Sequence, residues 1–165
     1  DVAQGRSLKA RLGQNPSMSN LRIYTASSWR NPRYDEVLLK IKDAGFNVYD
    51  FRNPPDNKAA FHWTAIDRDW ENWSAVRFRE NINHPIAQRG FKSDKAGMDW
   101  ADACVLILPS GKSSHLEAGY MVGQGKPLFI LLDGGEPELT YSLAAKLCIS
   151  IDELISELKE AEAKE

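Results

Sequence analysis

The sequence ACVLIL at residues 103–108 decides the fold, because it is a continuous apolar run. A run of this kind, without polar alternation, is typical of a strand buried on both faces of a parallel sheet. A second such run, PLFILL at 127–132, follows a segment whose apolar spacing predicts a helix over 115–124, closed by Gly125. Two buried strands with a helix between them predict a parallel sheet covered by helices.

The segments on either side continue this alternation. Residues 21–26 and 47–51 predict strands, and residues 34–44 predict a helix that ends at Gly45. The sequence therefore predicts a doubly wound, flavodoxin- or Rossmann-like α/β fold with about five parallel strands and helices on both faces. The remaining predictions are a long loop over 53–66, one or two helices within 67–83, an interruption at Pro85, helices over 91–101, 138–147 and 152–163, and room for a short strand near 148–150.

The chain of 165 residues fits one domain. We expect this domain to span residues 18–165, since Met18 stands immediately before the first predicted strand. Residues 1–17 lack apolar periodicity, and Asp1 is not a natural initiator, so a disordered arm or an artificial extension is expected there. Hydrophobic residues make up 42% and charged residues 27% of the chain, which is an ordinary globular mixture.

Charge and cysteine content argue against several classes of partner. The net charge is −2, so nothing favours binding to nucleic acid or to an anionic membrane surface. The sequence has no signal peptide and no apolar run long enough to span a membrane, which indicates a cytoplasmic protein. Cys104 and Cys148 lie in apolar segments, without a second thiol or a histidine at metal-ligand spacing. We therefore expect no metal ion and no cofactor.

A loop of small polar residues leads from the first buried strand into the next helix, in the sequence PSGKSSHLEAGY at 109–120. In doubly wound sheets ligands bind beyond the carboxyl ends of the strands, which here are the loops after Thr25, Phe51 and Leu108. A helix N-terminus offers free N–H groups and a partial positive charge to an anion such as phosphate. The candidate contributors are Gly111, Lys112, Ser113 and Ser114.

Two other interpretations of this loop matter. It is not a Walker loop, because the pattern GxxxxGK[ST] is absent. Ser114 and Glu117 also form a capping-box pattern, in which the glutamate only bonds back to the start of its helix. Either way, Glu117 is expected in the first turn, where the helix dipole favours its ionised form.

The segment SDKAGMDWAD at 93–102 precedes the buried strand and carries three aspartates. Asp94, Asp99 and Asp102 have the spacing of ordinary solvated helix charges, and Asp102 is expected to orient the junction between helix and strand. Tyr24 is expected near the carboxyl end of the first strand, where a lone tyrosine is usually a core residue.

Three segments in the same order resemble the nucleoside 2-deoxyribosyltransferase family. They are IYTAS at 23–27, SDKAG at 93–97 with Ala101-Asp102, and HLEAGY at 115–120 with GKP at 125–127. The resemblance implies that Glu117 attacks the anomeric carbon of a sugar, that Tyr24 holds this nucleophile, and that Asp94 contacts the nucleobase and assists its departure. It also implies a homo-oligomer.

The chain departs from the family in the loop before the nucleophile. The deoxyribosyltransferases have a second aspartate there, which binds a sugar hydroxyl, whereas this chain has the residues 111–114. That loop is closer to relatives that bind a 5′-phosphate and hydrolyse nucleoside monophosphates. The resemblance thus implies cleavage of the N-glycosidic bond of a nucleoside or nucleoside 5′-monophosphate, with transfer of the ribosyl or deoxyribosyl group to water or to another base.

Aromatic residues are candidates for binding the base. Trp29 and Trp63 lie in loops near the predicted pocket, where flat apolar rings stack on bases, and His62 is a candidate to assist the leaving group or a surface residue. The other tryptophans, Trp70, Trp73 and Trp100, are expected in the core. Two alternative functions stay open: a Toll/interleukin receptor-like NAD glycohydrolase, and a nucleotide sensor that binds without catalysis.

Overall fold

The computed structural model describes residues 19–55 and 60–164, which form a five-stranded parallel sheet with helices on both faces. The strand order is β2-β1-β3-β4-β5, and every pairing is parallel. This order is the flavodoxin-like form of the doubly wound fold, so the predicted fold class is confirmed. The strands are β1 (Arg22–Ala26), β2 (Asn47–Tyr49), β3 (Ala103–Ile107), β4 (Leu128–Leu131) and β5 (Lys146–Cys148).

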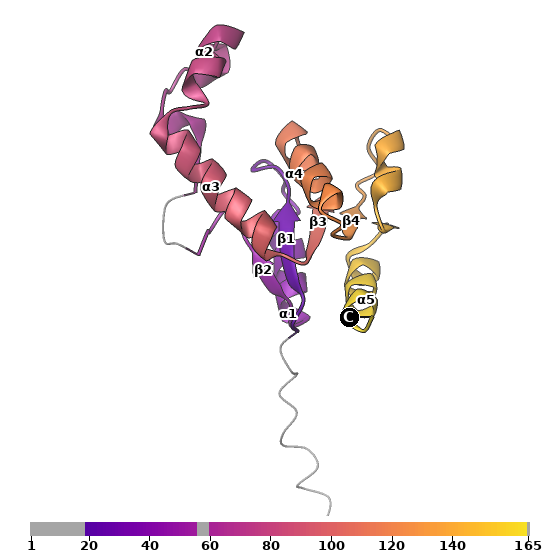
Figure 1. Ribbon diagram of the computed structural model, residues 1–165. Coiled ribbons are helices and arrows are strands. Elements are labelled where there is room, and N and C mark those ends of the chain that lie inside the picture. The colour runs from indigo at the N-terminus through magenta and orange to yellow at the C-terminus, as the bar shows by residue number, and fades with distance from the viewer. Residues whose placement is uncertain (1–18, 56–59, 165) are drawn as a thin grey trace, which may run out of the picture.

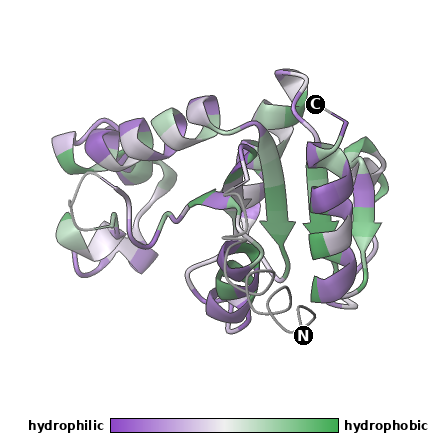
Figure 2. Cartoon of the chain, turned by 90° about the horizontal axis from the view of Figure 1, so that it is seen from below, coloured by the Kyte–Doolittle hydropathy of each residue, from purple (hydrophilic) through white to green (hydrophobic). Residues whose placement is uncertain are grey.

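The helices cover the sheet unevenly (Figure 1). One face carries α1 (Tyr34–Asp43) and α5 (Ile151–Glu162), and the other carries α3 (Pro85–Trp100) and α4 (Lys112–Gly123). The first half of α3 projects beyond the sheet together with α2 (Ala75–Asn81), as both Figure 1 and Figure 2 show. Three short 3-10 helices complete the fold: η1 (Trp63–Ala65), η2 (Trp70–Asn72) and η3 (Leu139–Leu143).

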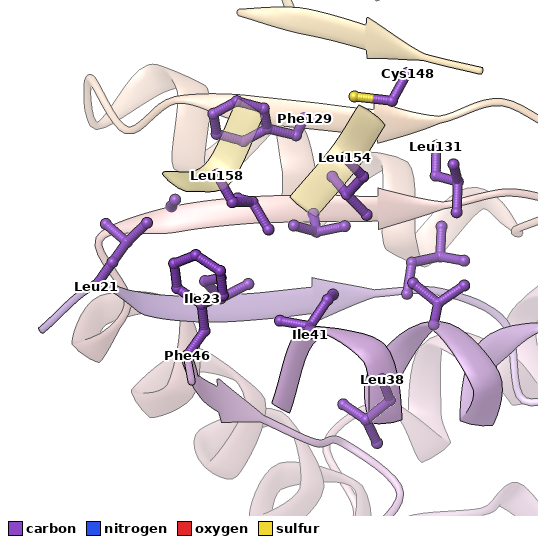
Figure 3. Close-up of a cluster of buried hydrophobic side chains, with 14 of the residues drawn as sticks. Leu21, Ile23, Leu38, Ile41, Phe46, Phe129, Leu131, Cys148, Leu154 and Leu158 are labelled. Atoms are coloured by element: carbon purple, nitrogen blue, oxygen red, sulfur yellow. The ribbon is translucent and has the colours of Figure 1, made fainter. Parts of the chain in front are cut away.

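The apolar run of β3 supplies both cores. Successive side chains of a strand point to opposite faces of the sheet. Val105 and Ile107 therefore join Ile41 and Leu158 in the cluster under α1 and α5 (Figure 3), whereas Leu106 joins the cluster under α3 and α4. Because both faces are covered, every residue of β3 is buried, and a polar side chain without a hydrogen-bond partner would be destabilising there.

A close approach between α3 and β2 fixes where α3 lies. Gly97 packs against the ring of Tyr49, and a Cβ atom at this position would lie 2.7 Å from that ring. With Gly97 in contact, the Tyr49 hydroxyl reaches Ser93 and Asp94 one turn earlier on the same helix. The glycine thereby places Asp94 over the carboxyl end of the sheet.

Several predicted boundaries were wrong. Pro85 does not interrupt a helix but starts one: it occupies the first helical position, where a proline loses no hydrogen bond, after a cap by His84. The helix predicted over 138–147 is instead η3 followed by β5, because pairing of Lys146 with Phe129 of β4 outweighs the local helical pattern. Residues 1–17, and 56–59 of the predicted loop, lie outside the described residues.

No helix among the described residues is long and apolar enough to cross a membrane. In the same part of the chain, no three His, Cys, Asp or Glu side chains come together as a metal site. Cys104 and Cys148 are both free and buried.

Candidate functional site

A cavity of about 1180 Å³ lies at the carboxyl end of the sheet, beside β1 and β3. The connection after β1 leads to β2 on one side, whereas the connection after β3 leads to β4 on the other side. Doubly wound sheets bind ligands at such a switch point. The loop after β1 contributes Ser27 to Arg30, the segment after β2 contributes Phe51 and Pro54, and the start of α4 contributes Gly111 to Ser114. The middle of α3 and the segment around η1 and η2 form the remaining wall.

Glu117 lies on α4 and lines this cavity, but it does not lie where a cap would be. The helix begins at Lys112, three residues earlier than predicted, and its N-cap is Gly111 without a side-chain cap bond. Glu117 is therefore in the second turn, and its carboxylate accepts a hydrogen bond from Ser113 Oγ at 3.2 Å. The capping box is wrong, and so is the placement of Glu117 in the first turn beside the dipole.

Tyr24 is a buried partner of this carboxylate. Its side chain is fully buried, and its ring stacks on that of Tyr49 with 5.3 Å between ring centroids. Burial, and then the charges of Glu117 and Asp94, raise the pKa of Tyr24, so the phenol stays protonated. It acts on Glu117 as a hydrogen-bond donor, which partly offsets the rise in the pKa of that carboxyl.

Asp94 is the second carboxyl group of the cavity. It comes from α3 and accepts a hydrogen bond from the Tyr49 hydroxyl at 3.1 Å. Burial raises the pKa of Asp94 to about 6, and burial together with the charge of Asp94 raises the pKa of Glu117 to about 7. Two interacting carboxyl groups of this kind titrate as a pair. Between about pH 6 and about pH 7 the pair therefore holds one proton.

The loop at the start of α4 has the features of an anion site. Gly111, Lys112 and Ser113 are exposed to the cavity, while Ser114 is buried at its edge. Lys112 makes no ion pair with any described residue, so its charge is available to a ligand. The free N–H groups of the first turn add to this field.

The predicted aromatic residues also reach the cavity. Trp29 meets the ring of Phe51 edge to face. Trp63 meets the ring of Phe61 in the same way, with 4.8 Å between the ring centroids. His62 lines the cavity but is engaged locally, since its Nδ1 accepts the Thr64 N–H at 3.2 Å as the cap of η1.

Three tryptophan predictions were wrong in the same direction. Trp70 and Trp73 are only partly buried, within the projecting segment and outside both cores, and Trp70 lines the cavity. Trp100 is 38% exposed, and the Arg22 guanidinium covers it at 5.6 Å. The usual burial of tryptophan and the helical spacing of Trp70 and Trp73 placed them in the core, whereas the structure leaves all three partly exposed outside it.

The other aspartates lie outside the cavity, and one residue of the site was not predicted. Asp102 binds Arg22 at the opposite end of the sheet and so ties α3 to β1, as expected for a junction residue. Asp99 is exposed and pairs with Lys95. Tyr49, which contacts both Tyr24 and Asp94, was missed, although its place at the end of a predicted strand was a usable signal.

A second, apolar cavity of about 520 Å³ reaches Glu117 and Asp94 from the side of α3 and α4. Its walls include the exposed side chains of Phe91, Leu116 and Tyr120. The two carboxyl groups therefore lie between a polar and aromatic cavity and an apolar one.

No known protein family and no curated protein matches the chain by sequence. Among solved structures, the 2-deoxyribosyltransferase of the psychrotolerant bacterium Bacillus psychrosaccharolyticus matches 81% of this chain and 90% of its own, with a TM-score of 0.59 and 18% identity. A CMP N-glycosidase of Clostridium botulinum matches 84% of this chain and 98% of its own, with a TM-score of 0.46 and 14% identity. The first match shows that the chain has the fold of a 2-deoxyribosyltransferase, so the resemblance seen in the sequence is confirmed at the level of the fold.

The raised pKa of Glu117 predicts that this carboxylate destabilises the folded protein at neutral and alkaline pH. The folded state binds a proton between about pH 4.5 and about pH 7 that the unfolded chain releases, so the free energy of unfolding falls as the pH rises through this window. Glu117→Gln removes this cost. We expect the variant to exceed the wild type in unfolding free energy by on the order of 1–3 kcal/mol at pH 8, and to differ little at pH 4.

Urea titrations at both pH values measure this difference. Glu160→Gln, an exposed change on α5 across the sheet, is the matched control and leaves the pH dependence unchanged. Equal unfolding free energies of Glu117→Gln and wild type at pH 8 would show that the carboxylate bears no burial cost.

Proposed function

We propose that the protein cleaves the N-glycosidic bond of a nucleoside or nucleoside 5′-monophosphate, with Glu117 as the nucleophile. The carboxylate of Glu117 carries this proposal, since Tyr24 and Ser113 orient it in a cavity that also contains Asp94. The fold of a 2-deoxyribosyltransferase, an enzyme described as a biocatalyst for nucleoside synthesis, supports the same chemistry.

In the proposed first step, one oxygen of Glu117 attacks the anomeric carbon while the bond from that carbon to the base nitrogen breaks. The bonding electrons leave with the base, and the sugar passes through an oxocarbenium-like state that an adjacent carboxylate stabilises. A glycosyl ester of Glu117 results, and water or another base then attacks the same carbon and releases the carboxylate. Donation from Tyr24 and Ser113 holds the carboxyl group in one orientation for both steps.

Asp94 is proposed to handle the proton. A departing base gains negative charge and needs a proton, and the raised pKa lets Asp94 keep one up to about pH 6, well above the range of an ordinary aspartate. Once that proton has left with the base, the Asp94 carboxylate can take a proton from attacking water. The hydrogen bond from Tyr49 keeps the carboxyl group facing the cavity in both states.

The start of α4 is proposed to bind a 5′-phosphate. In the free protein Ser113 donates to Glu117, and a phosphate would offer the hydroxyls of Ser113 and Ser114 a charged acceptor beside Lys112 and Gly111. A phosphate held there fixes the sugar above Glu117, because Glu117 lies in the second turn of α4, directly after the first turn that binds the phosphate. The base would then extend toward Trp29, Trp63 and His62, which also line the cavity.

The volume of the cavity favours one second candidate. At about 1180 Å³ it exceeds the range of about 300–1,000 Å³ usual for small-molecule sites. A dinucleotide such as NAD would fill more of it than a mononucleotide does, with Arg30 and Arg89 on the wall to meet its phosphates. NAD glycohydrolysis of the Toll/interleukin receptor-like type is thus the alternative reaction.

One screen separates these functions. Nucleosides, their 5′-monophosphates and NAD are incubated with the protein, with and without an acceptor base, and free base is measured by chromatography. We expect release from a 5′-monophosphate with kcat/KM about tenfold or more above that of its nucleoside, which corresponds to about 1.4 kcal/mol of phosphate binding. Glu117→Ala lowers release by on the order of 10³-fold or more, as loss of a nucleophile does.

Glu160→Gln, the exposed change on α5 across the sheet, is the control and keeps full activity. Release of nicotinamide alone would establish the NAD reaction instead. Tight nucleotide binding with no release from any substrate would identify a sensor, and full activity of Glu117→Ala would exclude this nucleophile.

The shared proton predicts a bell-shaped pH profile of kcat/KM with its maximum between about pH 6 and about pH 7. Within this range the pair holds one proton, and the reactive form has it on Asp94 with Glu117 ionised. Below the range both carboxyl groups are protonated, so Glu117 cannot attack, and above it both are ionised, so Asp94 has no proton for the base. Asp94→Asn should lower kcat/KM on the order of 10²-fold or more and abolish the alkaline limb. An unchanged alkaline limb in Asp94→Asn would assign the acid to another group.

We also propose that a second copy of the chain covers the apolar cavity between α3 and α4. That cavity opens onto Glu117 and Asp94, so without a cover both carboxyl groups would also be open to bulk water from the side of α3 and α4. Leu116 is 77% exposed at its rim, beside Phe91 and Tyr120. Contiguous exposed apolar side chains of this kind mark interaction surfaces.

Leu116→Asp should therefore convert a homo-oligomer to a monomer, as measured by light scattering after size-exclusion chromatography. Leu139→Asp is the matched control, since Leu139 is 89% exposed on η3, outside both cavities. A wild-type protein that is monomeric at high micromolar concentration would contradict this proposal.

A further inference from the structure

Arg52 lies immediately beyond β2 and binds the backbone of the neighbouring loop. Its Nη2 donates to three carbonyl oxygens of the loop after β1: Ser28 at 3.3 Å, Trp29 at 2.9 Å and Asn31 at 3.2 Å. Its Nη1 donates to Asp35 at 3.0 Å. The side chain is only 16% exposed and does not line the cavity.

The same guanidinium packs among aromatic rings. It covers the ring of Tyr34 at 4.4 Å and lies 5.7 Å from that of Trp29. Trp29 in turn meets Phe51 edge to face, with 5.4 Å between centroids and an angle of 88°. Both the backbone and the ring of Trp29 are thus held from the side of β2.

The loop that Arg52 holds is one wall of the cavity. All four residues from Ser27 to Arg30 line it, whereas Arg52 stands behind them. Asn31 secures the far end of the loop, because its side-chain amide donates to Ser27 Oγ and to the Ile107 carbonyl. Without Arg52, the stretch between these anchors would keep its local bonds, the ion pair of Arg30 with Glu71 and the ring contact of Trp29 with Phe51. Its backbone carbonyl groups, however, would lose their hydrogen bonds from the side of β2.

Only arginine fits this position. A planar guanidinium presents several N–H donors in fixed directions, whereas a lysine ammonium is a compact charge on a flexible stem. Within the described part of the chain, the buried Nε of Arg52 has no hydrogen-bond partner. The four side-chain hydrogen bonds of Arg52 all come from Nη1 and Nη2, which bind the loop and Asp35.

We infer that Arg52 is a positioning residue, which holds the loop after β1 so that the ring of Trp29 forms a preformed wall for the departing base. This inference rests on the proposed glycosidic cleavage. A wall that is already ordered costs less conformational entropy when the substrate binds. Since Arg52 does not line the cavity and contacts neither Glu117 nor Asp94, we expect it to affect substrate binding and not the bond-breaking step.

The test compares Arg52→Lys with Arg22→Lys. Arg22 is a matched control, because it also pairs with a carboxylate and covers a tryptophan, but at the opposite end of the sheet. We expect Arg52→Lys to raise KM about tenfold and to change kcat less than about threefold. We expect Arg22→Lys to lower thermal stability, because it loses the two-pronged contact with Asp102, and to keep the wild-type KM.

A double-mutant cycle shows whether Arg52 acts through Trp29. In the Trp29→Ala background, Arg52→Lys should no longer raise KM, since the ring that it positions is gone. Additive effects of the two changes would overturn the inference, as would an unchanged KM in folded Arg52→Lys.

A readout without substrate separates this inference from the proposed function. With 5-fluorotryptophan incorporated, the ¹⁹F resonance of Trp29 is assigned by Trp29→Phe. Arg52→Lys should shift or broaden this resonance and leave that of Trp100 unchanged, and Arg22→Lys should do the reverse. If the wild type releases no base while these spectra behave as expected, the proposed function fails and the positioning of Trp29 stands. If Arg52→Lys leaves the Trp29 resonance unaffected, the inference is overturned, whether or not the protein releases base.

Discussion

Two carboxyl groups, Asp94 and Glu117, share one partly buried space at the carboxyl end of the sheet, and the rest of the site is arranged around them. The sheet order creates that space, because β1 lies next to β3, with Tyr24 opposite Cys104. Helix α3 precedes β3 and α4 follows it, and both helices cover the same face of the sheet. Gly97 lets α3 approach close enough to present Asp94. Tyr24 and Tyr49, stacked on each other, supply one phenol to each carboxyl group.

Burial of two such groups opposes folding and yet suits the proposed chemistry. A carboxyl group away from water keeps its proton to higher pH, and a second carboxylate nearby strengthens the effect. Perturbed pairs of this kind gather at functional sites, where acid and nucleophile must coexist near neutral pH. The pairs outside the cavity are different. Asp102 with Arg22, and Asp99 with Lys95, join opposite charges that lower the pKa of each aspartate.

Much of this arrangement could be predicted from the sequence, and the failures share a cause. Buried strands are apolar throughout, so 103–108 and 127–132 located the middle of the sheet and hence its carboxyl end. Residue order could not reveal that α4 begins at Lys112 or that Lys146 pairs with β4, because helix starts and edge strands depend on tertiary contacts. Tyr49 and Arg52 were missed for the same reason: their partners are distant in sequence, and neither lies in a recognisable motif.

The most direct measurement is to trap the ester on Glu117. A nucleoside 5′-monophosphate with fluorine at the 2′ position of its sugar destabilises the oxocarbenium-like state and slows both steps; combined with a good leaving base, it lets the ester accumulate. Mass spectrometry of the digested protein should then show one added glycosyl phosphate on the peptide that contains Glu117, together with one equivalent of released base. Release of base without an adduct, or an adduct on any other side chain, would contradict the account.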